Sequence, residues 1–238
     1  INPLLDVTFD GLHILNGDIV SPQPNILVRL KDENLFLALN DTDDFGVYLK
    51  KPGSNSISKR IFFGDEMSFT PAVLPNNSAE INYRPNLLED GVYTLRIWAR
   101  DRSDNLSGNI DFEIDFVVIN KSTITEVLNY PNPFSTSTKF VFTLTGSKVP
   151  ETFKVQVLTV TGKVVKEITQ DEIGPIRIGR NVTEYAWDGK DEFGDQLANG
   201  VYLYRVVSRI EGQSIEKRES GADSFIQKGF GKMYPVSY

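Results

Sequence analysis

The chain has 238 residues, enough for two domains of ordinary size, and its 40% hydrophobic and 24% charged residues are typical of a folded protein. The net charge is −7, and neither half carries the basic patch that nucleic-acid binding requires. The absence of cysteine excludes disulfides, thiolate zinc sites and a cysteine nucleophile, and no apolar run approaches the ~18 residues of a membrane span.

Apolar and polar residues alternate along the first half with a period of two. This pattern predicts strands over residues 5–10, 93–100 and 110–118, each with one face on a core and the other toward water. Glycine-containing turn pairs separate the strands, at Asn16-Gly17, Pro52-Gly53 and Asp90-Gly91. Many short strands divided by such turns favour an antiparallel sandwich over alternating strands and helices.

A short polar segment, residues 120–123, predicts a domain boundary after Ile119. Further strands are expected at 139–144, 152–160, 163–169, 182–187 and 201–207, followed by a polar loop over 211–223 and a last strand within 225–236. The predicted fold is therefore all-β, with two tandem antiparallel Ig-like β-sandwich domains. The first covers residues 1–119, and the second covers 120–238 with a C-terminal tail strand.

The Asn199-Gly200 pair predicts a tight hairpin turn in which Gly200 has a positive φ. In the strand that follows, the alternation places Tyr202 and Tyr204 on one face.

Two motifs in the second half carry a resemblance to a known family. They are Asn129-Tyr130-Pro131-Asn132-Pro133-Phe134 and the run from Trp187-Asp188-Gly189-Lys190-Asp191 to Asn199-Gly200-Val201-Tyr202. Together they resemble the Ig-like domain of flagellar hook-capping proteins, which is also appended to many secreted bacterial proteins. The resemblance implies a sandwich domain on a secreted or surface protein.

A wider resemblance covers essentially the whole chain. The segments Asn2–Val7, Asn16–Ser21, Leu88–Gly91 and Lys228–Met233 resemble the region that follows the peptidase domain in gingipain-like type IX secretion sortases of Bacteroidetes. The likeness is strongest to the second, sortase-like paralogue of that family. It implies an extracellular or outer-membrane surface location. The chain starts without a Met or a signal peptide, so we expect it to be part of a longer polypeptide.

The acidic loop over residues 188–195 gathers carboxylates that could hold a Ca²⁺ ion through Asp188, Asp191 and Asp195. Residues 41–44 and 101–105 form similar acidic clusters in the first domain. The competing interpretation is that these Asp and Gly residues build turns through local hydrogen bonds, and it needs no metal. No other cofactor is expected.

Several single residues stand out from the strand pattern. We expect the prolines of residues 132–134 to form an irregular edge that blocks strand pairing, with Phe134 plugging the sandwich end. Trp187 is predicted to fill the core beneath the acidic loop. Trp98 falls on the polar face of its strand, where it covers a contact between domains, stays exposed or meets a ligand. The single His13 is interpreted as a packing or surface residue.

The family's catalytic cysteine and histidine have no counterpart in this sequence, since there is no Cys and His13 lies in a different segment. We therefore expect a non-catalytic structural or interaction region, monomeric, with a neighbouring catalytic domain or the secretion machinery as its partner. The alternative is a carbohydrate-binding or adhesin module attached to a secreted hydrolase. That function requires a row of exposed aromatics, for which the sequence offers Trp98, Tyr202 and Tyr204.

Overall fold

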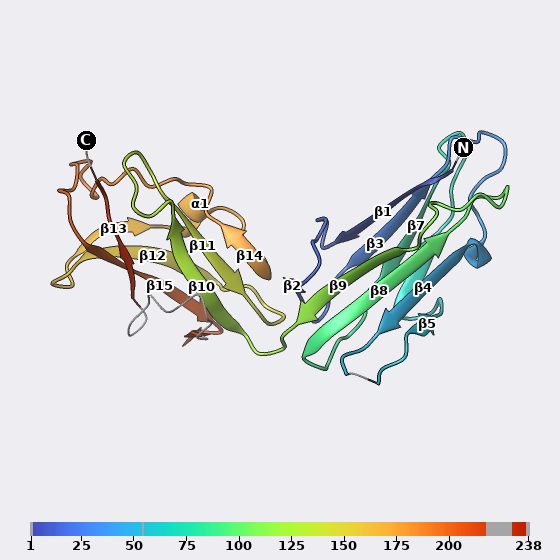
Figure 1. Cartoon of the computed structure of the whole chain (residues 1–238), viewed down its shortest axis with the longest axis horizontal. Coiled ribbons are helices and arrows are strands. Elements are labelled where there is room, and N and C mark those ends of the chain that lie inside the picture. Colours follow the sequence, from blue (N-terminus) through green and yellow to red (C-terminus); the bar gives the residue numbers. More distant parts are fainter. Residues whose placement is uncertain (1, 54, 218–229, 237–238) are drawn as a thin grey trace. The chain divides into compact units, whose positions relative to one another are not determined.

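The computed structural model describes residues 2–53, 55–217 and 230–236. The chain divides into two compact units, Ile1–Asn120 and Lys121–Tyr238, one residue later than the boundary predicted after Ile119. Each unit is a sandwich of two mainly antiparallel sheets, so the predicted all-β fold is confirmed (Figure 1). Within the described ranges the helices are short, η1 (Thr42–Asp44) and α1 (Gln170–Ile173), and none is long and apolar enough to cross a membrane.

Unit 1 is built from a four-stranded and a five-stranded sheet. The first has the order β1 (Leu4–Phe9), β3 (Ile26–Lys31), β7 (Ser78–Tyr83) and β6 (Met67–Thr70). The second has the order β2 (Asp18–Val20), β9 (Phe112–Val118), β8 (Gly91–Ala99), β4 (Phe45–Lys50) and β5 (Lys59–Ile61). All neighbours are antiparallel except β2 and β9, which run parallel.

The core of unit 1 follows the predicted alternation. One face of β8 is at most 1% exposed and carries Tyr93, Leu95, Ile97 and Ala99. It packs in one apolar cluster with Ile26, Val28 and Leu30 of β3. The burial of this whole cluster provides most of the driving force for the folding of unit 1. The predicted strand at 110–118 is wrong at its start, because β9 begins at Phe112 and Ile110 is 87% exposed.

Unit 2 also contains two sheets. The first has the order β14 (Gly179–Val182), β11 (Lys139–Leu144), β10 (Thr123–Tyr130) and β17 (Glu216–Lys217). The second has the order β13 (Val164–Ile168), β12 (Thr152–Thr159), β15 (Tyr202–Ile210) and β16 (Gln213–Ser214), and β18 (Gly231–Met233) also pairs with β15. The core between these sheets includes Phe140, Phe142, Phe153 and Trp187.

Two local predictions for unit 2 are wrong. The strand expected at 182–187 lies earlier, at β14, and the residues after it lead instead to Trp187 in the core. Gly200 does not have a positive φ. The physical reason is that residue 200 does not join two paired strands. The segment before it is the acidic loop, and β15 pairs with β12 and β18.

The polar loop expected over 211–223 is described as far as residue 217, with a turn at Glu211 and Gly212 that both have positive φ. The remainder of that prediction, and the part of the last strand before residue 230, lie outside the described residues. Within the predicted 225–236 strand, the described pairing with β15 is confined to β18.

Candidate functional site

The acidic loop of unit 2 uses its carboxylates to form turns. Asp191 Oδ1 accepts the backbone N–H of Phe193 at 2.9 Å and that of Asp195 at 3.0 Å. Asp188 Oδ1 accepts the N–H of Lys190 at 3.2 Å, and its other oxygen pairs with the Lys190 ammonium at 3.1 Å. Within the described ranges no group of three or more acidic or histidine side chains is arranged to hold a metal. A Ca²⁺ site at Asp188, Asp191 and Asp195 stays a prediction.

The pKa of Asp188 lies below its ordinary value. Partial burial acts in the opposite direction, but the side-chain and backbone hydrogen bonds from Lys190, together with its positive charge, outweigh the burial. At neutral pH the loop therefore holds an ionised carboxylate that is already neutralised within the same turn.

Trp187 anchors this loop from below. Its side chain is fully buried, and the indole N–H donates to the carbonyl of Lys190 at 2.8 Å. Phe134 lies 5.6 Å away, ring to ring, and is 4% exposed. Both aromatics thus have the positions expected from the sequence, and together they fix the loop to the core.

The proline-rich segment is irregular, as expected, and its strand-like pairing is limited to one isolated parallel bridge between Phe134 and Pro235. Phe134 donates its N–H to the carbonyl of Tyr234 at 3.2 Å and accepts that of Val236 at 2.9 Å. The Asn132 side chain donates to Lys232 O at 3.0 Å and accepts from Tyr234 N at 3.1 Å. The side-chain amide of Asn132 supplies one donor and one acceptor, as a backbone peptide group would. The prolines on either side cannot do this, because they have no backbone N–H to donate.

The two motifs of the second half and residues 235–236 border one shallow hollow of about 410 Å³. Its lining includes Phe134, Ser135, Asp188, Lys190, Leu197 and Pro235. The fold therefore brings together three segments that are distant in the sequence, and the sequence signal for this site was the paired motifs.

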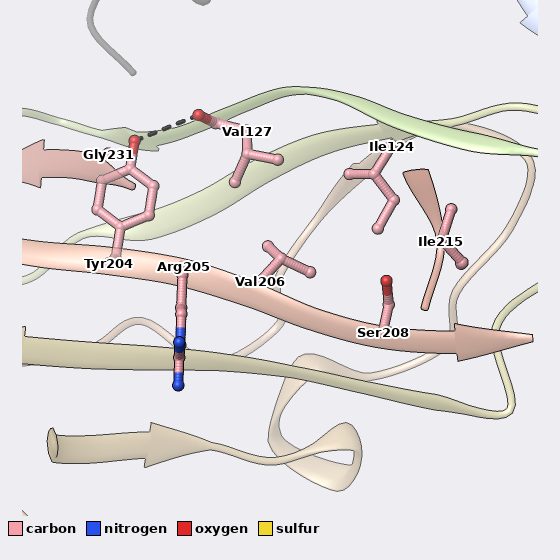
Figure 2. A pocket seen from close by; sticks show the side chains of 8 residues that line it. All are labelled: Ile124, Val127, Tyr204, Arg205, Val206, Ser208, Ile215 and Gly231. Carbon is pink, nitrogen blue, oxygen red and sulfur yellow. Dashed lines mark hydrogen bonds between the residues drawn. The ribbon is translucent and has the colours of Figure 1, made fainter. Parts of the chain in front are cut away.

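A second, much smaller cavity of about 40 Å³ lies between β10 and β15 (Figure 2). Tyr204, Val206 and Ser208 point into it from one face of β15, whereas Arg205 points the opposite way. The Tyr204 hydroxyl donates to the carbonyl of Val127 at 3.2 Å. This volume has room for a few water molecules at most, so it is a packing gap rather than a substrate site.

In unit 1 the structure brings the two acidic clusters together, and arginines occupy the space between them. The buried Asp44 accepts from Arg100 Nε at 3.0 Å and from Arg102 Nη1 at 3.1 Å. Arg102 also contacts Asp41 at 2.8 Å, and Arg100 contacts Asp104 at 2.9 Å. The guanidinium groups neutralise the carboxylates in the way a bound cation would, and they do so with fixed geometry.

Two acids of these clusters, Asp41 and Asp101, have pKa values below the ordinary value. The backbone N–H of Asp43, followed by the Arg102 guanidinium, lowers the pKa of Asp41. Asp101 is 3% exposed, and burial alone would raise its pKa. Hydrogen bonds from Asn105 and Ser103 outweigh that burial and hold the pKa of Asp101 below its ordinary value.

The three candidate aromatics, Trp98, Tyr202 and Tyr204, do not form an exposed row. Tyr204 is only 4% exposed, and Tyr202 packs partly buried against the core of unit 2 with its hydroxyl bonded to Ala198 O at 3.2 Å. The prediction of Tyr204 as an exposed candidate is wrong, because the tyrosines occupy the inner face of β15. Trp98 lies over Gly46 on the neighbouring strand. His13 is exposed, with Nε2 2.6 Å from Asp6 Oδ1.

No protein-family model and no curated protein matches the chain. Among solved structures, PorU from Porphyromonas gingivalis, described as dimeric and latent, is similar with a TM-score of 0.39 and 18% identity over 100% of this chain. The BSP domain of a biofilm-associated protein gives a TM-score of 0.28 with 10% identity over 98% of the chain. Fibronectin(III)-like modules of CbhA from Clostridium thermocellum give 0.25 with 13% identity over 90%.

The chain spans 20% of the PorU chain, 30% of the biofilm protein and 95% of the CbhA modules. At these identities the similarity concerns the Ig-like or fibronectin-like sandwich fold alone.

Proposed function

We propose that this chain is a non-catalytic structural and interaction region of a larger secreted or outer-membrane surface protein related to the gingipain-like type IX secretion sortases. The observation that carries the proposal is that the residues of the two motifs make structural contacts within unit 2. Trp187, Phe134 and Asn132 build the end of unit 2 and hold the chain end. The acids beside them serve turn amides. The motifs thus specify a rigid scaffold.

The partner we propose is a neighbouring catalytic domain of the same polypeptide, with the secretion machinery as the other partner class. Rigid sandwiches present loops at fixed positions, which suits a region that holds another domain in place. A carbohydrate-binding or adhesin role is the weaker candidate. Tyr202 and Tyr204 face the core, so they cannot form a row of exposed aromatics with Trp98.

The test combines an assay of the chain with its deletion from the parent protein. The isolated chain should release no product from panels of peptides and polysaccharides, with the parent protein as the positive control. Deleting the same residues from the parent should lower the yield or heat resistance of the neighbouring domain. Turnover by the isolated chain that one Asp or Glu substitution abolishes would contradict the proposal, as would a parent whose neighbouring domain is unaffected by the deletion.

A further inference from the structure

One loop of unit 1 presents three consecutive apolar side chains to water. It follows β3 and contains Leu35, Phe36 and Leu37, which are 56%, 89% and 46% exposed. Single exposed apolar residues are common on protein surfaces, but a run of three at a loop tip is characteristic of contact surfaces. We call residues 34–37 the apolar tip.

The apolar tip has a defined backbone conformation. Asn34 Oδ1 accepts the N–H of Phe36 at 2.8 Å and that of Leu37 at 3.0 Å. The buried Asn77 donates to the carbonyls of Asn34 at 2.8 Å and Leu37 at 2.9 Å and accepts from Leu39 N at 2.8 Å. Two asparagines therefore hold the backbone of the tip, so little backbone entropy is lost when its apolar side chains are covered.

The surroundings of the apolar tip are strongly acidic. The tip and the loop after β8 border the same open hollow, which Leu35, Phe36, Asp101 and Ser103 help to line. Residues 31–44 and 100–105 together contain seven acidic and three basic side chains, a net charge of −4, and three of the acids are buried: Asp32, Asp44 and Asp101. The two arginines are already paired with Asp41, Asp44 and Asp104. An apolar centre with an acidic surround fits a partner surface that is apolar at its centre and basic around it.

The apolar tip also lies beside the first strand of the chain. Leu4, at the start of β1, pairs with Lys31, the last residue of β3, immediately before the loop that carries the tip. Leu4 is itself 68% exposed. In Figure 1 the start of β1, the loop after β3 and the loop after β8 lie at the same end of unit 1.

We infer that the apolar tip docks unit 1 onto an apolar surface, rimmed by Lys and Arg, on the neighbouring domain of the same polypeptide. This inference rests on the proposed function and adds the surface that carries it. Phe36 is the central anchor because it is the most exposed of the three side chains and is held by the Asn34 turn. The acidic surround selects the partner and orients it.

The test uses the full parent protein with a photo-crosslinking phenylalanine analogue at position 36. The matched control carries the analogue at Phe193, which is 91% exposed in unit 2. Because an anchor at the centre of an interface is covered whereas an exposed residue is not, we expect the intramolecular crosslink yield at position 36 to exceed that at 193 by about tenfold or more. Peptide mapping should place the product on an apolar surface with Lys or Arg nearby.

A charge reversal tests the acidic surround. Glu33→Lys with Asp43→Lys should lower the crosslink yield at position 36 several-fold, roughly as expected for charged pairs at an interface rim. Asp65→Lys with Glu66→Lys, an exposed acidic pair in the loop between β5 and β6, is the control and should leave the yield unchanged.

Equal yields at positions 36 and 193, products on a different polypeptide, or no effect of the charge reversal would overturn the inference. These results remain separate from the deletion test. If the neighbouring domain loses stability when the chain is deleted but position 36 does not crosslink to it, the proposed function holds and this docking surface is wrong.

Discussion

Two aromatic side chains lie over glycines on the neighbouring strand, one pair in each unit. Trp98 pairs with Gly46, and Tyr204 pairs with Gly231. A Cβ atom on Gly46 would lie 2.0 Å from Trp98 Nε1, and one on Gly231 would lie 2.0 Å from Tyr204 Cζ. Glycine normally weakens a strand, and an aromatic ring that covers the bare backbone compensates for this loss.

Replacing Gly46 by Ala should therefore destabilise unit 1. The new methyl group overlaps the indole of Trp98, and we expect the free energy of unfolding to fall by about 1–3 kcal/mol, as in other overpacked sites. Urea unfolding measures the change. Gly64→Ala is the control, because nothing lies within 4 Å of a Cβ there and its φ is not positive, so it should be near neutral. Equal effects of the two variants would show that Trp98 does not lie over Gly46.

The buried carboxylate of Asp101 gives unit 1 a measurable acid dependence. Its folded pKa is below the ordinary value of 3.8, so its ionised form stabilises the fold above that value. This contribution is lost as the pH falls through the folded pKa. Asp101→Asn should cost about 1–2 kcal/mol at pH 7 through loss of charge-assisted hydrogen bonds, and the difference from the wild type should shrink toward pH 2. Unfolding curves at several pH values measure both quantities.

Asp104→Asn is the matched control for this acid dependence. Its side chain is 81% exposed and forms one surface ion pair with Arg100. Exposed pairs contribute little, so we expect a change below about 0.5 kcal/mol at every pH. A pH-independent cost of Asp101→Asn would contradict the role of its ionised form.

At the scale of elements, the strands could be predicted where one face is buried and the other is not. The strand at 139–144 is confirmed with its bounds, and the alternation of 93–99 matches the buried face of β8. The prediction failed where contacts distant in the sequence decide the structure. The backbone of Phe134 pairs with residues 234–236, about a hundred positions away, and no local pattern reports such a pairing.

The candidate sites, too, could be predicted where local spacing decides them and not where contacts distant in the sequence do. Spacing identified the acidic loops as structured turns or cation sites, and it placed Trp187 beneath one of them. It did not show that Arg100 and Arg102 would join the two acidic clusters of unit 1, because that contact depends on how β4 and β8 pair. The apolar tip was also missed, since Leu35-Phe36-Leu37 looks like core sequence until its exposure is known.

Strand β18 should contribute strongly to unit 2, although it has only three residues. Met233 is fully buried between the sheets. Met233→Ala should lower the free energy of unfolding of unit 2 by about 2–5 kcal/mol, the range for deleting a large core side chain. Lys232→Ala, an exposed neighbour on the same strand, should change it little. Denaturant unfolding of the two variants gives the comparison, and a similar small effect for both would place Met233 outside the core.

At the scale of the whole molecule, each unit has its own apolar core. We expect residues 1–120 and 121–238, produced separately, each to fold with a β-type circular dichroism spectrum and a cooperative melting transition. A fragment that stays unfolded alone but folds when the other is added would show that its core is incomplete without its neighbour.

The order in which the cores are completed has a consequence for synthesis. Unit 1 has all its described strands once Val118 has been made, whereas unit 2 needs Met233, 115 residues later, to fill its interior. The first sandwich can therefore fold while the second still lacks β18, the strand that pairs with β15 over Tyr202–Tyr204. During that interval unit 2 is the part of the nascent chain that chaperones and proteases can recognise.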